Sequence, residues 1–320
     1  MGLRRRVAWG LVLGLAAPAV FYGQATITPR PKRPERPPGD VPRANIRVDT
    51  SLVLVPVSVY DPLNRPVTGL EKENFRVFDD RREQTITHFA MDDEPVAVGL
   101  VFDTSGSMGA KLRRSRMAAQ AFFKTSNPED EFSLVEFDSK PRLVVPLTSD
   151  TGHLEDELLF SRSKGSTALL DAVVLALNEM KKSKRNKKAL LIISDGGDNN
   201  SRYSTGEVKE RVIESDSLIY AIGVFEPGGG MSPEELAGPG LLGHLAEQTG
   251  GRMYVANAVE MPDIAFKIGV ELRNRYVLGY APGDQQHDGR YHRVQVVVLP
   301  PRGLPHLHAN WRMGYYAPVE

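Results

Sequence analysis

Three continuous apolar segments limit what this chain can fold into more than any other feature of the sequence. They are Val96–Phe102, Ala189–Ile193 and Leu218–Val224. Runs of this kind are typical of strands buried on both faces, as in a parallel sheet. Apolar residues at helical spacing lie between them, for example over residues 170–180. Strands that alternate with helices predict a doubly wound α/β domain, which we place at residues 95–273.

The segments on either side of this domain have the composition of strands and turns. Val53, Val55, Val57 and Val59 alternate with other residues, which predicts a strand with one valine face turned inward. In the tail we expect three strands, at Tyr276–Tyr280, His292–Leu299 and Leu307–Tyr316. So few strands need a packing partner. We therefore expect residues 46–94 and 274–320 to form one discontinuous β domain, into which the α/β domain is inserted.

The first 45 residues read as a targeting segment followed by a linker. Three arginines precede an apolar run from Val7 to about Val20, and small residues follow it, as in a secretory signal peptide over residues 1–25. The run is shorter than the ~20 residues that span a membrane, so we expect no membrane span in the mature chain, although an uncleaved anchor is the alternative. Residues 26–45 are rich in proline and predict an extended linker. The folded part is then secreted, periplasmic or bound to the cell envelope.

Charge and cysteine content exclude several classes of protein. Lys+Arg and Asp+Glu both total 40, so no net charge draws the chain to nucleic acid. The basic stretch Lys181–Lys188 lacks neighbouring aromatic residues and reads as a solvated helix end and loop. The chain has no cysteine, which excludes disulfides, thiolate metal sites and cysteine nucleophiles.

A set of oxygen donors directly follows the first buried strand. Asp103, Ser105 and Ser107 alternate in an extended turn, so their side chains can point to one side. One carboxylate and two hydroxyls are hard ligands, which favour Mg²⁺ or Mn²⁺. Asp195 ends the strand Ala189–Ile193, and Thr167 lies on the loop that opens the preceding helix. If the two buried strands are neighbours where strand order reverses, all five side chains converge on one crevice. The alternative is that Asp103 and Ser107 cap the next helix and Asp195 caps a turn.

These residues carry a resemblance to a known family. The segments DTSGS at 103–107, Thr167 and Asp195-Gly196 resemble the metal-ion-dependent adhesion site of von Willebrand factor type A domains. The flanking segments look like the acidobacterial-type group of secreted proteins related to this domain. The resemblance implies a six-stranded, mostly parallel sheet, direct ligation by both serines, Thr167 as a state-dependent ligand, and Asp195 acting through water. Ser166 stands where a glycine is expected in this group.

These observations together predict a binding module rather than an enzyme. A cation held by few protein charges keeps water ligands, and an Asp or Glu carboxylate of a protein partner can displace one of them. One alternative is a Mg²⁺-assisted hydrolase that uses the same pocket. Another is a structural scaffold of the cell envelope with an inactive site. The sequence contains no Walker loop, HExxH motif or serine-hydrolase elbow.

Overall fold

The structure is a computed structural model that describes residues 52–92, 94–225, 233–257, 259–282 and 288–317. The expected signal peptide and the proline-rich linker lie outside the described residues. No helix in the described ranges is both long and apolar enough to cross a membrane.

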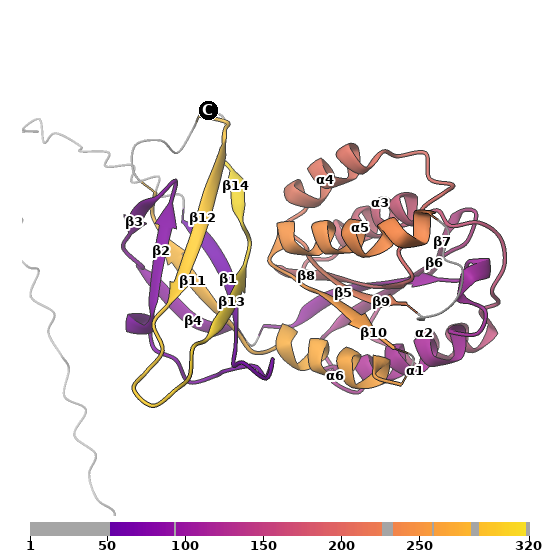
Figure 1. Cartoon of the computed structure of the whole chain (residues 1–320), viewed down its shortest axis with the longest axis horizontal. Coiled ribbons are helices and arrows are strands. Elements are labelled where there is room, and N and C mark those ends of the chain that lie inside the picture. Colours follow the sequence, from indigo (N-terminus) through magenta and orange to yellow (C-terminus); the bar gives the residue numbers. More distant parts are fainter. Residues whose placement is uncertain (1–51, 93, 226–232, 258, 283–287, 318–320) are drawn as a thin grey trace, which may run out of the picture. The chain divides into compact units, whose positions relative to one another are not determined.

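A six-stranded sheet forms the centre of the α/β part, with the strand order β10-β9-β8-β5-β6-β7 (Figure 1). All neighbours are parallel except β6 and β7, which are antiparallel. The mostly parallel, doubly wound sheet that the apolar runs predicted is therefore confirmed. The strands are β5 (Val96–Asp103), β6 (Glu131–Phe137), β7 (Pro141–Thr148), β8 (Lys187–Ser194), β9 (Leu218–Val224) and β10 (Met253–Ala256).

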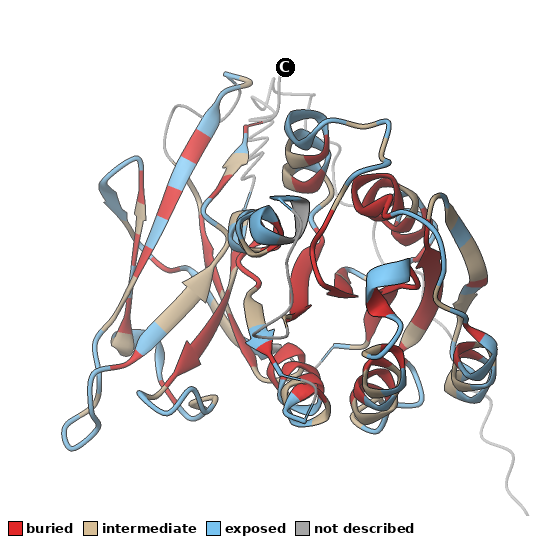
Figure 2. Ribbon diagram, turned by 45° about the vertical axis from the view of Figure 1, so that its right-hand side comes forward, coloured by how far each residue is buried: buried red, intermediate tan, exposed pale blue. Residues whose placement is uncertain are grey.

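Helices cover both faces of this sheet, as doubly wound topology requires. Figure 1 shows α1, α2 and α6 on one face and α3, α4 and α5 on the other. Each layer encloses a hydrophobic cluster against the sheet, and in Figure 2 the strands and the inner helix faces are buried. The helices are α1 (Leu112–Phe123), α2 (Thr151–Phe160), α3 (Leu169–Met180), α4 (Thr205–Glu214), α5 (Pro233–Thr249) and α6 (Met261–Leu272).

Strands from before and after the α/β part pair with each other in two four-stranded sheets. The orders are β13-β1-β11-β4 and β14-β12-β2-β3. Their inner faces share one apolar cluster that includes Val55, Val57, Val59 and Tyr276. The strands are β1 (Val53–Tyr60), β2 (Phe75–Asp79), β3 (Arg82–Gln84), β4 (His88–Asp92), β11 (Arg275–Tyr280), β12 (Tyr291–Val298), β13 (His308–Trp311) and β14 (Gly314–Tyr316).

The last expected strand is in fact two strands. Residues 307–316 were predicted as one element, but β13 pairs with β1 and β14 pairs with β12 in the other sheet. Arg312 lies at the break, where its guanidinium forms an ion pair with Asp216 and donates to the carbonyl of Ile213 on α4. The chain changes sheets at this point, a step that hydrophobic alternation does not reveal.

The chain enters and leaves the α/β part at adjacent points. Asp92, near its start, pairs with Arg275, just after its end, in the antiparallel β4–β11 ladder. The buried carboxylate of Asp130 ties both connections together. It accepts a hydrogen bond from the Val96 amide at 2.9 Å and forms an ion pair with Arg273.

Candidate metal site at the carboxyl end of the central sheet

Strand order reverses beside β5, and this reversal places the expected site residues. After β5 the chain continues to β6 on one side, whereas β8 pairs with β5 on the other side. Loops that leave two such strands diverge and leave a crevice at their carboxyl ends, where ligands bind in open α/β sheets. Asp103 is the last residue of β5, and Asp195 directly follows β8. The two aspartates therefore stand on neighbouring parallel strands.

Asp103 is completely buried and both of its carboxylate oxygens are engaged. Oδ1 accepts the backbone amide of Ser105 at 2.8 Å, and Oδ2 accepts the hydroxyl of Ser194 at 2.6 Å. Burial, with the nearby charge of Asp195, raises the pKa of Asp103 to about 7, although the hydrogen bonds from Ser105 and Ser194 act in the opposite direction. A positive charge in the crevice would stabilise the ionised form.

Asp195 has one oxygen that lacks a partner. Its Oδ2 lies 3.1 Å from the ammonium of Lys111, which is itself mostly buried. Its Oδ1 is buried and has no hydrogen-bond partner among the described residues. An unpaired buried carboxylate oxygen is costly, so this atom fits a ligand that is a cation or carries a donor.

Ser105 and Ser107 complete the group of hard oxygen donors. Their hydroxyl oxygens lie 3.1 Å apart, and Ser107 is exposed. Ser105 stands at the N-cap of the short 3₁₀ turn Gly106–Met108, but its side chain makes no capping hydrogen bond. Helix α1 begins with Lys111 as its N-cap, also without a side-chain cap. Neither Asp103 nor Ser107 therefore caps α1, although Asp103 accepts the Ser105 amide within the turn.

Thr167 reaches the same edge of the sheet through its backbone. Its amide donates to Asn199 Oδ1 at 2.9 Å, and its carbonyl accepts the amides of Asn199 and Asn200, which follow β8. The preceding loop is hydrogen-bonded to the turn after β5, where the Gly106 amide donates to the Gly165 carbonyl at 3.0 Å. Three loops are thus joined, yet within the described residues no hydrogen bond links the Thr167 hydroxyl to the other four side chains.

Two contributors to the site, Ser194 and Lys111, were not found by sequence reasoning. Ser194 bridges the site, since its hydroxyl donates to Asp103 and accepts the Gly196 amide at 2.9 Å. Lys111 supplies the only ammonium recorded against Asp195 in the described chain. For Gly196, which the motif already includes, the structure adds a reason for the glycine: its φ is +78°, and a Cβ there would lie 2.7 Å from the Cα of Gly238 on α5. Of the two missed residues, only Ser194 carried a signal, because it directly precedes Asp195 at the end of an apolar run.

A mostly parallel six-stranded sheet with helices on both faces defines a doubly wound α/β domain. Residues 98–197 match the family model described as the von Willebrand factor type A domain. The chain therefore contains a von Willebrand factor type A domain, and the resemblance suggested by the motif residues is confirmed at this level.

Among known proteins, the chain is 26% identical over 196 residues to an uncharacterized protein of Borreliella burgdorferi, covering 54% of this chain and 56% of that protein. It is 27% identical over 154 residues to inter alpha-trypsin inhibitor heavy chain 4 of Mus musculus, covering 42% of this chain and 16% of that protein. The chain thus spans less than two thirds of either relative.

Solved structures that match this chain include the von Willebrand factor type A protein from Catenulispora acidiphila. It has a TM-score of 0.48 and 13% identity, and the match covers 76% of this chain and 74% of that one. The vWF domain of the type V pili tip protein Mfa5 from Porphyromonas gingivalis has a TM-score of 0.47 and 15% identity. That match covers 56% of this chain and 97% of that one.

Proposed function

We propose that this chain is a metal-dependent protein-binding module that acts outside the cytoplasm. Asp103, Ser105 and Ser107 would hold Mg²⁺ or Mn²⁺, with the two serines as direct ligands, Thr167 as a state-dependent ligand and Asp195 acting through water. When bound, the cation supplies a coordination position that an acidic side chain of a partner protein can take. The proposal assigns the chain to adhesion or scaffolding rather than to catalysis.

The observation that carries this proposal is the electrostatic imbalance of the crevice. Asp103 and Asp195 are both at most 2% exposed, and the ammonium of Lys111 forms an ion pair with Asp195. Asp195 Oδ1 has no hydrogen-bond partner among the described residues. Burial raises the pKa of Asp103 to about 7. Hydroxyls and carboxylates together are the donor set of a hard divalent cation, which would supply the missing charge.

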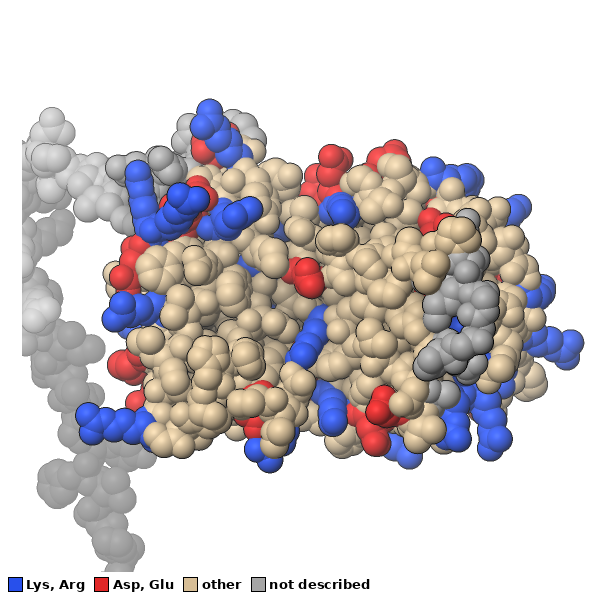
Figure 3. Space-filling model, in the orientation of Figure 1, with Lys and Arg blue, Asp and Glu red and all other residues tan. Residues whose placement is uncertain are grey.

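Global charge offers no competing explanation for partner binding. On the face shown in Figure 3, cationic and anionic side chains both occur around the margin, and neither sign covers the surface. The formal net charge of the chain is zero. Recognition by a local cation therefore accounts for selectivity better than recognition by a long-range field.

The location rests on the N-terminal pattern. A basic start, an apolar run and small residues are typical of a secretory signal, and a proline-rich linker would then separate the folded part from the envelope. The hydrolase and inactive-scaffold alternatives share this location and differ from the proposal only at the crevice.

A titration of the full chain with Mg²⁺, followed by thermal unfolding and calorimetry, tests the proposal. We expect saturable stabilisation by Mg²⁺ that EDTA reverses and that Asp103→Ala abolishes. Asp156→Ala, the same change at an exposed aspartate of α2, is the matched control and should behave as wild type. A wild-type chain without Mg²⁺-dependent stabilisation would favour the inactive scaffold.

A capture experiment separates binding from hydrolysis. Envelope and culture fractions are passed over the immobilised wild type, the Asp103→Ala variant and the Asp156→Ala variant, each with Mg²⁺ or with EDTA. The proposal predicts partners retained by wild type and by Asp156→Ala only with Mg²⁺. Turnover of phosphoesters or peptides that depends on Asp103 would instead support the hydrolase.

A further inference from the structure

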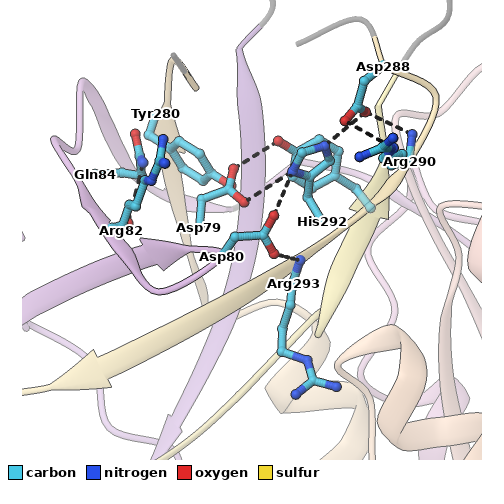
Figure 4. A network of polar contacts seen from close by, with 10 residues as sticks. Asp79, Asp80, Arg82, Gln84, Tyr280, Asp288, Arg290, His292 and Arg293 are labelled. Carbon is cyan, nitrogen blue, oxygen red and sulfur yellow. Dashed lines mark hydrogen bonds and ion pairs between the residues drawn. The ribbon is translucent and has the colours of Figure 1, made fainter. Parts of the chain in front are cut away.

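A second group of metal-ligating side chains lies in the β sheets, on elements that the central site does not use. Asp79 ends β2, Asp80 follows in the turn to β3, and His292 stands on β12, which pairs with β2 (Figure 4). His292 Nδ1 lies 3.0 Å from Asp80 Oδ2 and 3.8 Å from Asp79 Oδ1. One ligand atom from each residue lies within 4.8 Å of the others.

One oxygen of each carboxylate accepts hydrogen bonds from residues outside this group of three. Asp79 Oδ2 accepts hydrogen bonds from the hydroxyls of Tyr280 and Tyr315, both at 2.9 Å. Asp80 Oδ1 accepts the backbone amide of Arg293 at 3.0 Å. These bonds fix both carboxylates in orientation and leave the other oxygen of each free to face the histidine.

The imidazole is oriented in the same way. His292 Nε2 lies 3.1 Å from Asp288 Oδ1, and the ring stacks on Tyr315 with centroids 5.5 Å apart. A carboxylate on one ring nitrogen fixes the other nitrogen as the ligand, an arrangement that commonly orients metal-bound histidines. Nδ1 is the nitrogen that faces Asp79 and Asp80.

The second oxygen of Asp79, Oδ1, is the atom that indicates a missing ligand. Asp79 is 6% exposed, and its Oδ1 has no hydrogen-bond partner among the described residues. Donor atoms around a tetrahedral zinc ion lie about 3.4 Å apart, from bond lengths near 2.0–2.2 Å. The three inner atoms are spaced between 3.0 and 4.8 Å, so small side-chain adjustments would let one ion contact all three.

We propose that Asp79, Asp80 and His292 form a binding site for a first-row divalent metal ion, with Zn²⁺ as the preferred occupant. One imidazole nitrogen and two carboxylate oxygens suit Zn²⁺ better than the hard, all-oxygen preference of Mg²⁺. Asp288, Tyr280 and Tyr315 are positioning residues that hold the ligands. The site differs from the central crevice in donor type, and it joins strands that precede and follow the α/β part.

A protonated His292 would compensate the negative charge of the surrounding carboxylates less completely than a divalent metal ion. Three carboxylates, Asp79, Asp80 and Asp288, surround the His292 ring, and Arg290 lies 4.0 Å from Asp288. One imidazolium contacts Asp80 and Asp288 but leaves Asp79 Oδ1 without a hydrogen bond. A divalent ion at Nδ1 would satisfy that oxygen and neutralise both aspartates of the cluster.

The test is a Zn²⁺ titration of the full chain against a chromogenic chelator, with Co²⁺ absorption as a report on the ligand set. We expect one Zn²⁺ per chain at this site and at least about tenfold weaker binding in Asp80→Asn. Asp80 is half exposed, has a φ of +45° that asparagine tolerates, and keeps its Oδ1 acceptor in this variant, so folding is preserved. Asp288→Asn should weaken binding by about tenfold and shift the Co²⁺ spectrum, since it alters the orientation of His292.

Three controls identify the origin of any zinc signal. Glu83→Gln makes the same charge change on the exposed side of β3 and should bind as wild type. The double variant His306→Ala/His308→Ala removes the imidazole pair whose ring centroids lie 5.1 Å apart, and Asp103→Ala removes the central site. Both should retain the zinc site. The proposal is overturned if wild type binds no zinc, if Asp80→Asn binds as wild type, or if binding is lost only with the His306/His308 pair.

Discussion

The hydroxyl of Ser194 should be worth more to this protein than its small size suggests. Ser194 is fully buried at the end of β8, where its hydroxyl donates to Asp103 Oδ2 at 2.6 Å and accepts the Gly196 amide at 2.9 Å. Ser194→Ala removes both bonds without adding volume. It leaves a buried amide unpaired and takes from Asp103 one of the hydrogen bonds that stabilise its charged form.

The size of the effect follows from the two bonds. A hydrogen bond to a charged group contributes about 1.5–3 kcal/mol, and one between neutral groups about 0.5–1.5 kcal/mol. Ser194→Ala should therefore lower the free energy of unfolding by about 2–4 kcal/mol, measured above the pKa of Asp103, which is about 7. Because the lost bond also orients Asp103, Mg²⁺ affinity should fall by about tenfold.

Ser133 provides a matched control in the same sheet. It is also fully buried, on β6, but its hydroxyl has no hydrogen-bond partner among the described residues. Ser133→Ala should change stability by less than about 1 kcal/mol or raise it, since it removes an unsatisfied polar group. Urea denaturation of both variants, compared at equal m-values, gives the answer. Equal effects of Ser194→Ala and Ser133→Ala would refute the reasoning.

Three further changes probe the site and the core. Gly196→Ala should destabilise the chain by more than about 2 kcal/mol, because φ is +78° and a Cβ meets the Gly238 backbone; urea denaturation that shows wild-type stability would contradict the close contact. Lys111→Met should raise Mg²⁺ affinity by about tenfold in calorimetry at low salt, because the ammonium lies 3.1 Å from Asp195 and repels a bound cation. Unchanged affinity would show that Lys111 does not influence metal binding. Phe122→Ala should cost about 3–5 kcal/mol in thermal or urea unfolding, since the ring is buried in the aromatic cluster of α1 and β6, and a loss below about 1 kcal/mol would show that this cluster repacks.

The central sheet could be predicted because its strands are buried on both faces. The runs in β5, β8 and β9 are continuous, and every residue of β5 is buried. Edge strands carry no such signal. In β7 only Val145 is buried, and β10 has four residues, so neither shows a pattern that separates it from a loop.

The residues of the central site differ in how well the sequence alone predicts them. Asp103, Ser105 and Ser107 are neighbours in the chain, so their spacing is visible directly. Ser194 faces Asp103 because Phe102 pairs with Ile193 in the parallel register, and sequence does not determine that register.

The β-sheet cluster was invisible to motif reasoning for a different reason. His292 stands far from Asp79 and Asp80 in the chain, with the whole α/β part between them, and no local spacing connects them. Only the pairing of β2 with β12 brings the three residues together. Strand partners that distant are set by the tertiary fold, which local patterns do not specify.

The adjacent entry and exit of the α/β part have a mechanical consequence. Tension applied by a partner at the carboxyl end of β5 would run lengthwise down that strand and reach the β sheets through two connections, one into β4 and one from α6 into β11. The two share the load side by side, and Asp130 clamps them at the point where they converge. A pull on the site would therefore load paired strands in shear instead of peeling a single strand away, which would raise the resistance of the proposed binding module to force.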